Sequence, residues 1–136
     1  MGMYTQCRGW LNIDSISYMK DKISAFENLL REAQEKFVET QDGRTFVCYD
    51  TWIHEGSNGS TFIFFGTELK NYDRDFERWV EFLLKYFPNA EGRLDIQYEE
   101  DDIFGKTTYL EICEGRIAEK TCKTWCKGYG NMWVNK

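Results

Sequence analysis

The sequence predicts an α+β fold, with two helices on one face of an antiparallel sheet. Three observations support this class. Two segments place apolar residues three and four positions apart, several shorter segments alternate or are rich in β-branched and aromatic residues, and the two kinds of segment are interleaved along the chain. A length of 136 residues, of which 42% are hydrophobic, is enough to bury a core in one domain.

The first strand is predicted at residues 3–13. Cys7 and Leu11 fall on one face of this alternating segment, and Trp10 falls on the other. A long amphipathic helix is expected to follow over residues 16–37. Its apolar stripe consists of Met19, Ile23, Phe26, Leu29, Leu30, Ala33 and Phe37.

Two further strands are predicted at residues 44–52 and 61–69, because both segments are rich in β-branched and aromatic residues. The loop between them, residues 54–60, contains a Gly-Ser-Asn-Gly-Ser sequence that is typical of turns. We therefore expect the two strands to form a hairpin with a rather long loop.

A second helix is expected to begin at an N-cap, Asn71 or Asp73, and to end before Pro88. Its spacing of apolar residues predicts one buried stripe. That stripe consists of Phe76, Trp79, Val80, Leu83, Leu84 and Phe87.

Three more strands are predicted at residues 93–99, 107–113 and 116–122, the last two joined by a turn at Glu114-Gly115. The order strand, helix, strand, strand, helix, strand is that of the ferredoxin-like βαββαβ fold, an antiparallel sheet with two helices on one face. The last two strands add a C-terminal β-hairpin to this arrangement.

Charge is unevenly distributed along the predicted single domain, residues 1–136. The formal net charge is −6, and residues 1–105 carry 20 acidic and 11 basic side chains. The core is expected at residues 3–122, and residues 123–136 form a basic tail with two tryptophans. An acidic body repels phosphate backbones, so we expect attraction to a basic protein surface and no direct binding of nucleic acid.

Five cysteines, an odd number, together with the lack of a signal-peptide core or a long apolar run, predict a cytoplasmic protein with reduced thiols and no membrane contact. Cys113, Cys122 and Cys126 have only part of the spacing of a zinc site, because a second close pair of ligands is missing. The single histidine, His54, is expected in a solvated loop. We therefore expect no metal, no other cofactor and no enzymatic activity.

The candidate binding site is the acidic segment of residues 90–102, whose one basic residue is Arg93. Such a segment suits a surface that mimics spaced phosphates and occupies a groove rich in Lys and Arg. Tyr98 is expected to add an aromatic anchor. The predicted partner-binding residues are Glu91, Asp95, Tyr98, Glu99, Glu100, Asp101 and Asp102.

Three other functions are alternatives to this site. A metal-dependent nuclease of ferredoxin-like fold would use Asp14, at the end of the first strand, as a metal-binding acid. A ligand-sequestering protein would gather Trp and Tyr side chains around the Gly56–Ser60 loop. An RNA-recognition module is disfavoured, because the aromatic segment 44–49 lacks the basic, glycine-bearing consensus of such modules.

Residues 3–13, together with Tyr86-Phe87-Pro88, Tyr98-Glu99-Glu100-Asp101 and Gly105, resemble small ferredoxin-like proteins carried by phages and plasmids. The resemblance lies in the order and spacing of the elements. It implies an origin in a mobile element and a role like that of anti-CRISPR proteins, which inhibit bacterial defence. The leading hypothesis is a non-enzymatic inhibitor that blocks a basic, nucleic-acid-binding surface of a host complex. A homodimer is left open.

Overall fold

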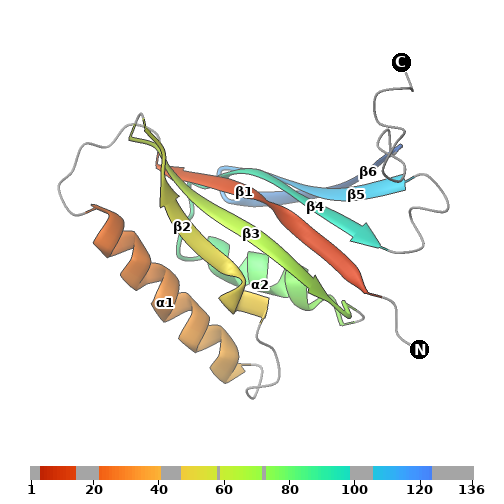
Figure 1. Ribbon diagram of the computed structural model, residues 1–136, viewed down its shortest axis with the longest axis horizontal. Helices are drawn as coiled ribbons and strands as arrows, with labels where there is room; N and C mark the ends of the chain where they lie inside the picture. Colours follow the sequence, from red (N-terminus) through yellow and green to blue (C-terminus); the bar gives the residue numbers. More distant parts are fainter. Residues whose placement is uncertain are drawn as a thin grey trace.

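The computed structural model describes residues 4–14, 22–40, 47–57, 59–71, 73–98 and 106–123. Its elements are β1 (Thr5–Asp14), α1 (Lys22–Thr40), the 3-10 helix η1 (Val47–Tyr49), β2 (Thr51–Glu55), β3 (Thr61–Leu69), α2 (Asp75–Leu84), β4 (Glu91–Tyr98), β5 (Lys106–Cys113) and β6 (Arg116–Lys123). Within these ranges the strands form one six-stranded antiparallel sheet in the order β2-β3-β1-β4-β5-β6 (Figure 1). The predicted α+β class is confirmed.

Both α-helices of the described chain lie on the same side of the sheet (Figure 1). We call the covered side the inner face and the opposite side the outer face. Helix α2 packs on the inner face, where the ring centroids of Phe65 and Phe76 are 5.9 Å apart. The Trp79 indole nitrogen also donates a hydrogen bond to Thr51 Oγ1 (3.0 Å). Helix α1 packs on α2, since the ring centroids of Phe37 and Trp79 are 5.2 Å apart.

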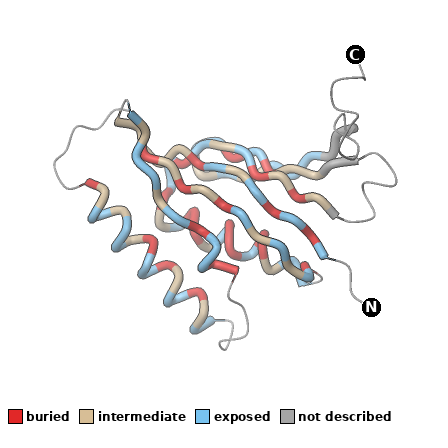
Figure 2. The backbone as a smooth tube through the Cα atoms, in the orientation of Figure 1, coloured by how far each residue is buried: buried red, intermediate tan, exposed pale blue. Residues whose placement is uncertain are grey.

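Strand β1 alternates between the two faces, as its sequence predicts. Cys7 and Leu11 are fully buried on the inner face, whereas Trp10 is 43% exposed on the outer face. Figure 2 shows the alternation of buried and exposed residues along this strand. The buried residues of the sheet and of both helices form one hydrophobic cluster between the inner face and the helices.

The stripe predicted for the second helix is fully buried, and the stripe predicted for the first helix is buried only in part. All six residues of the former are buried, as are Leu30, Ala33 and Phe37 of α1. Of the remaining α1 stripe, Ile23, Phe26 and Leu29 are partly buried, and Met19 lies outside the described residues. Helix α2 begins at Asp75, later than expected, but Asn71 Oδ1 does accept a hydrogen bond from the Phe76 N–H (3.0 Å). The start of the first predicted helix, residues 16–21, lies outside the described residues. Within the described part of the chain, no helix has the length and apolar character needed to cross a membrane.

The strand predicted at residues 44–52 is confirmed only at Thr51 and Trp52 within its described part. Residues 47–49 form η1, and β2 begins only at Thr51. The Asp50 N–H donates to the Val47 carbonyl (3.2 Å), and Gln34 Nε2 of α1 donates to the Cys48 carbonyl (3.0 Å). These contacts with the turn and with α1 override the β-propensity of the segment. The later strands agree with prediction to within about two residues at each described end.

Two glycines allow β1 and β4 to pair closely. A Cβ atom at Gly9 would lie 2.2 Å from the Arg93 carbonyl oxygen, and one at Gly92 would lie 2.1 Å from the Trp10 carbonyl oxygen. Gly9 also has φ +153°, a backbone conformation that side chains disfavour. The pairing of these two strands therefore depends on the absence of side chains at both positions.

We predict that Gly92→Ala lowers the free energy of unfolding by about 2–4 kcal/mol, because the new methyl group meets backbone that cannot move without breaking the β1–β4 pairing. Gly66→Ala is the matched control, since a Cβ there meets only the Trp52 ring at 3.5 Å. Its effect is expected to stay within about 1 kcal/mol. Urea unfolding followed by circular dichroism measures both. Equal losses in the two variants would contradict the close approach.

Candidate functional site on the outer face of the sheet

The predicted acidic site is described only in part. Glu91 and Asp95 both lie on the outer side of β4, where Glu91 is exposed and Asp95 is partly exposed. Tyr98 is the last residue of β4. Residues 99–102, which hold four of the predicted carboxylates, lie outside the described residues.

The described part of the acidic segment is not uniformly negative. Arg93 Nε donates to Asp95 Oδ1 (3.0 Å), and the Arg93 guanidinium carbon lies 3.9 Å from the centroid of the Tyr109 ring. On the next two strands, Lys120 Nζ donates to Glu111 Oε2 (3.0 Å), and this hydrogen bond raises the pKa of Lys120. The β4-β5-β6 half of the outer face thus carries charges of both signs that pair with one another.

The other half of the outer face is aromatic. We call its rings the aromatic patch: Trp10 of β1, Trp52 and His54 of β2, and Phe62 and Phe64 of β3. The two tryptophans are 43% and 51% exposed, which is high for such large apolar side chains. The patch is continuous in its centre, because the Phe62 ring centroid lies 6.2 Å from that of Trp10 and 5.9 Å from that of Phe64. The His54 ring lies 5.9 Å from Phe64.

The register of β2, β3 and β1 brings these rings together on the outer face. Trp52 pairs with Phe64, and Phe64 pairs with Trp10, so the three form a row across β2, β3 and β1. His54 pairs with Phe62 in the neighbouring row. Residues directly opposite each other in antiparallel strands share a face, so the pairing places all five rings together.

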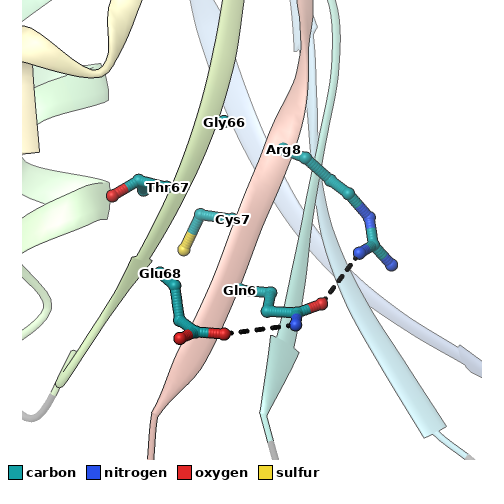
Figure 3. Close-up of a pocket in the computed structure, with 6 residues that line it drawn as sticks. All are labelled: Gln6, Cys7, Arg8, Gly66, Thr67 and Glu68. Carbon is teal, nitrogen blue, oxygen red and sulfur yellow. Dashed lines mark hydrogen bonds between the residues drawn. The ribbon is translucent and has the colours of Figure 1, made fainter.

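A hollow of about 320 Å³ adjoins the aromatic patch. Gly66 of β3 leaves the outer face without a side chain there, and Gln6, Arg8 and Glu68 are among the residues around it (Figure 3). These polar groups form a chain of hydrogen bonds, in which Arg8 donates to Gln6 Oε1 (3.0 Å) and Gln6 Nε2 donates to Glu68 Oε2 (3.3 Å). The Trp52 ring lies next to Gly66, since a Cβ atom at Gly66 would be 3.5 Å from it.

Asp14, the metal-binding acid of the nuclease alternative, forms an ion pair with a lysine. Lys22, which is only 8% exposed, places its Nζ 3.3 Å from Asp14 Oδ2 and also donates to the Gly59 carbonyl. This buried ammonium links the end of β1, the start of α1 and the β2–β3 turn. Among the described residues, no three His, Cys, Asp or Glu side chains are grouped as metal ligands.

The cysteines that the structure describes differ in exposure. Cys7 and Cys48 are buried, and Cys113 is exposed. Burial raises the pKa of the Cys48 thiol to about 11, and it raises the pKa of Cys7 still further. Both buried thiols are therefore neutral and poor nucleophiles near neutral pH. The side chains of Cys122 and Cys126, which the zinc alternative needs, lie outside the described part.

In comparisons with protein-family models, with curated proteins and with solved structures, nothing matches this chain. The resemblance to small proteins of phages and plasmids therefore stays a prediction.

We predict that the buried thiols make the folded protein less stable at alkaline pH. An unfolded thiol loses its proton near its ordinary pKa of 9.0, whereas folded Cys48 keeps its proton until about pH 11. The unfolded state therefore gains stability as the pH rises from about 9 to about 11, and the free energy of unfolding falls over that window. Cys48→Ala should flatten this decline in urea unfolding at pH 8, 9 and 10. Cys113→Ala, at an exposed thiol, should leave it unchanged. An equal fall of the unfolding free energy with pH in the wild type, Cys48→Ala and Cys113→Ala would contradict a role for the Cys48 thiol.

Proposed function

We propose that the chain is a non-enzymatic protein-binding module that contacts its partner through the outer face of the sheet. The aromatic patch is the observation that carries this proposal. Exposed apolar patches on a protein surface mark interaction sites, and tryptophans supply a large share of the binding energy at protein interfaces. Within the described residues both α-helices pack on the inner face, so no described helix covers the patch.

The charge of the chain favours a partner with a basic surface. The formal net charge is −6, and exposed Glu91 adds a carboxylate to the outer face. A negative protein attracts a basic surface over several ångströms and thereby speeds their association. Exposed tryptophan rings also bind the cationic side chains that such a surface presents.

A protein partner is favoured over a nucleic acid because two described cations on the strands beside and within the aromatic half, Arg93 and Arg8, already have partners. Arg93 binds Asp95 and lies on Tyr109, and Arg8 donates to Gln6. Proteins that bind single strands combine stacking rings with a positively charged groove. Here the rings are present, but the neighbouring cations are paired and the chain as a whole repels phosphates.

Two finer expectations belong to this proposal. We infer a ferredoxin-like unit from β1 to β4, which is supported by the strand order β2-β3-β1-β4 and by the positions of α1 after β1 and α2 after β3. We also infer an inhibitor that occupies the basic surface of a nucleic-acid-handling host complex. The excess of acidic residues before residue 106, including the carboxylates of residues 99–102, supports this role.

Trp10→Ala tests the proposed function. The wild-type chain and this variant are immobilised and exposed to a bacterial lysate that has been treated with nuclease. Loss of the Trp10 anchor is expected to weaken retention of a basic protein about tenfold or more. Retention should also fall as salt is raised from 50 to 300 mM, because oppositely charged surfaces attract less at high ionic strength.

Tyr49→Ala is the matched control, since Tyr49 is 50% exposed and belongs to η1, outside the aromatic patch. This control is expected to retain the basic protein as the wild type does. Equal retention by wild type and Trp10→Ala would contradict the proposal. Micromolar binding of a 20-nucleotide single strand that is lost in Trp10→Ala would also contradict it and would assign the face to nucleic acid instead.

A further inference from the structure

The outer face already holds one arginine between an aromatic ring and a carboxylate. The guanidinium of Arg93 lies on the Tyr109 ring, with 3.9 Å between its central carbon and the ring centroid, and donates to Asp95 Oδ1 at 3.0 Å. Tyr109 and Asp95 are directly paired across β5 and β4. A planar guanidinium can stack on a ring and donate to a carboxylate at the same time, which a lysine ammonium does less well.

The hollow at Gly66 has the same two kinds of group nearby, and the arginine that lines it, Arg8, is bonded to Gln6. Trp52 supplies a half-exposed ring at one side, and Glu68, two residues along β3, supplies a carboxylate on the same face. Gly66 lines the hollow without a side chain, and a Cβ atom there would lie 3.5 Å from the Trp52 ring. The hollow is large enough for one long side chain.

We propose that the hollow binds an arginine side chain of the partner protein, with the guanidinium stacked on Trp52 and donating to Glu68. This inference rests on the proposed function and names the chemistry of one contact within it. The acidic balance of the chain complements a basic partner, and a cation on tryptophan is the strongest of the common cation–ring pairs.

Two cations of the chain itself could compete for Glu68, namely Arg8, which lines the hollow, and Lys70, two residues along the chain from Glu68, but each has another contact. Figure 3 shows the Arg8 side chain directed away from Glu68, with its guanidinium bonded to Gln6 Oε1. Lys70 Nζ lies 5.5 Å from the centroid of the Tyr4 ring. The described contacts of Glu68 leave it room to accept further hydrogen bonds, because a carboxylate has about four acceptor positions and Gln6 Nε2 uses one.

The test uses three short peptides as probes: acetyl-Gly-Arg-Gly-amide, its citrulline analogue, and its lysine analogue. Citrulline has nearly the shape of arginine without the charge. In ¹⁵N-labelled protein, the arginine peptide is expected to shift the Gly66 amide and the Trp52 indole N–H signals at millimolar concentration. The citrulline peptide should bind at least about threefold more weakly, and the lysine peptide should lie between the two.

Glu68→Gln should weaken binding of the arginine peptide about threefold to fivefold, and Gly66→Leu should abolish the shift at Trp52 by filling the hollow. Glu91→Gln is the matched control, since it removes a carboxylate from the same face at a distance from the hollow. It should leave the affinity unchanged. The spectrum of each variant shows whether it has folded.

Equal shifts with the arginine and citrulline peptides would overturn the proposal, as would equal losses of affinity in Glu68→Gln and Glu91→Gln. The proposed function fails separately. If Trp10→Ala releases the basic protein while Glu68→Gln and Gly66→Leu retain it, the interaction face stands and the arginine site is wrong. If Trp10→Ala retains it, the interaction face is wrong whatever the peptides show.

Discussion

The pairing of β1 with both β3 and β4 is the interaction on which the rest of the structure depends. β1 lies between the aromatic and the charged halves of the sheet, and its backbone hydrogen bonds hold both of them. Gly9 and Gly92 permit the approach to β4, and the alternation of the strand sends Leu11 into the core and Trp10 to the outer face. A shift of β1 by one residue would exchange these two sides and remove both the core contact and the central ring of the aromatic patch.

The two faces of this sheet have different consequences for function. The inner face is closed by helices α1 and α2, and the hydrogen bond from Trp79 to Thr51 joins α2 to β2 there. On the outer face, large rings and a side-chain-free position at Gly66 are exposed together. Rings such as Trp10 and Trp52 gain free energy when a partner covers them, whereas paired charges such as Arg93 and Asp95 contribute more to orientation than to affinity.

The sequence predicts the elements better than it predicts the surface. The helical stripes and the exposure of Trp10 follow from periodicity, because each is a local pattern. The segment Phe62-Ile63-Phe64-Phe65 is apolar at every position, so only pairing with β1 and β2 shows which rings face outward. The η1 turn was missed because its contact with Gln34 is a tertiary one. The acidic segment is evident in the sequence, but the charge on Asp95 is balanced by Arg93 from the same strand, and residues 99–102 lie outside the described chain.

Photo-crosslinking from the two sides of the molecule shows directly which face of the sheet contacts the partner. p-Benzoylphenylalanine is placed either at Phe62, in the aromatic patch, or at Phe82 of α2, and both positions are partly exposed phenylalanines. After irradiation in bacterial cells, we expect a protein adduct from position 62 and none from position 82. Adducts from position 82 alone, or nucleic-acid adducts from position 62, would contradict it.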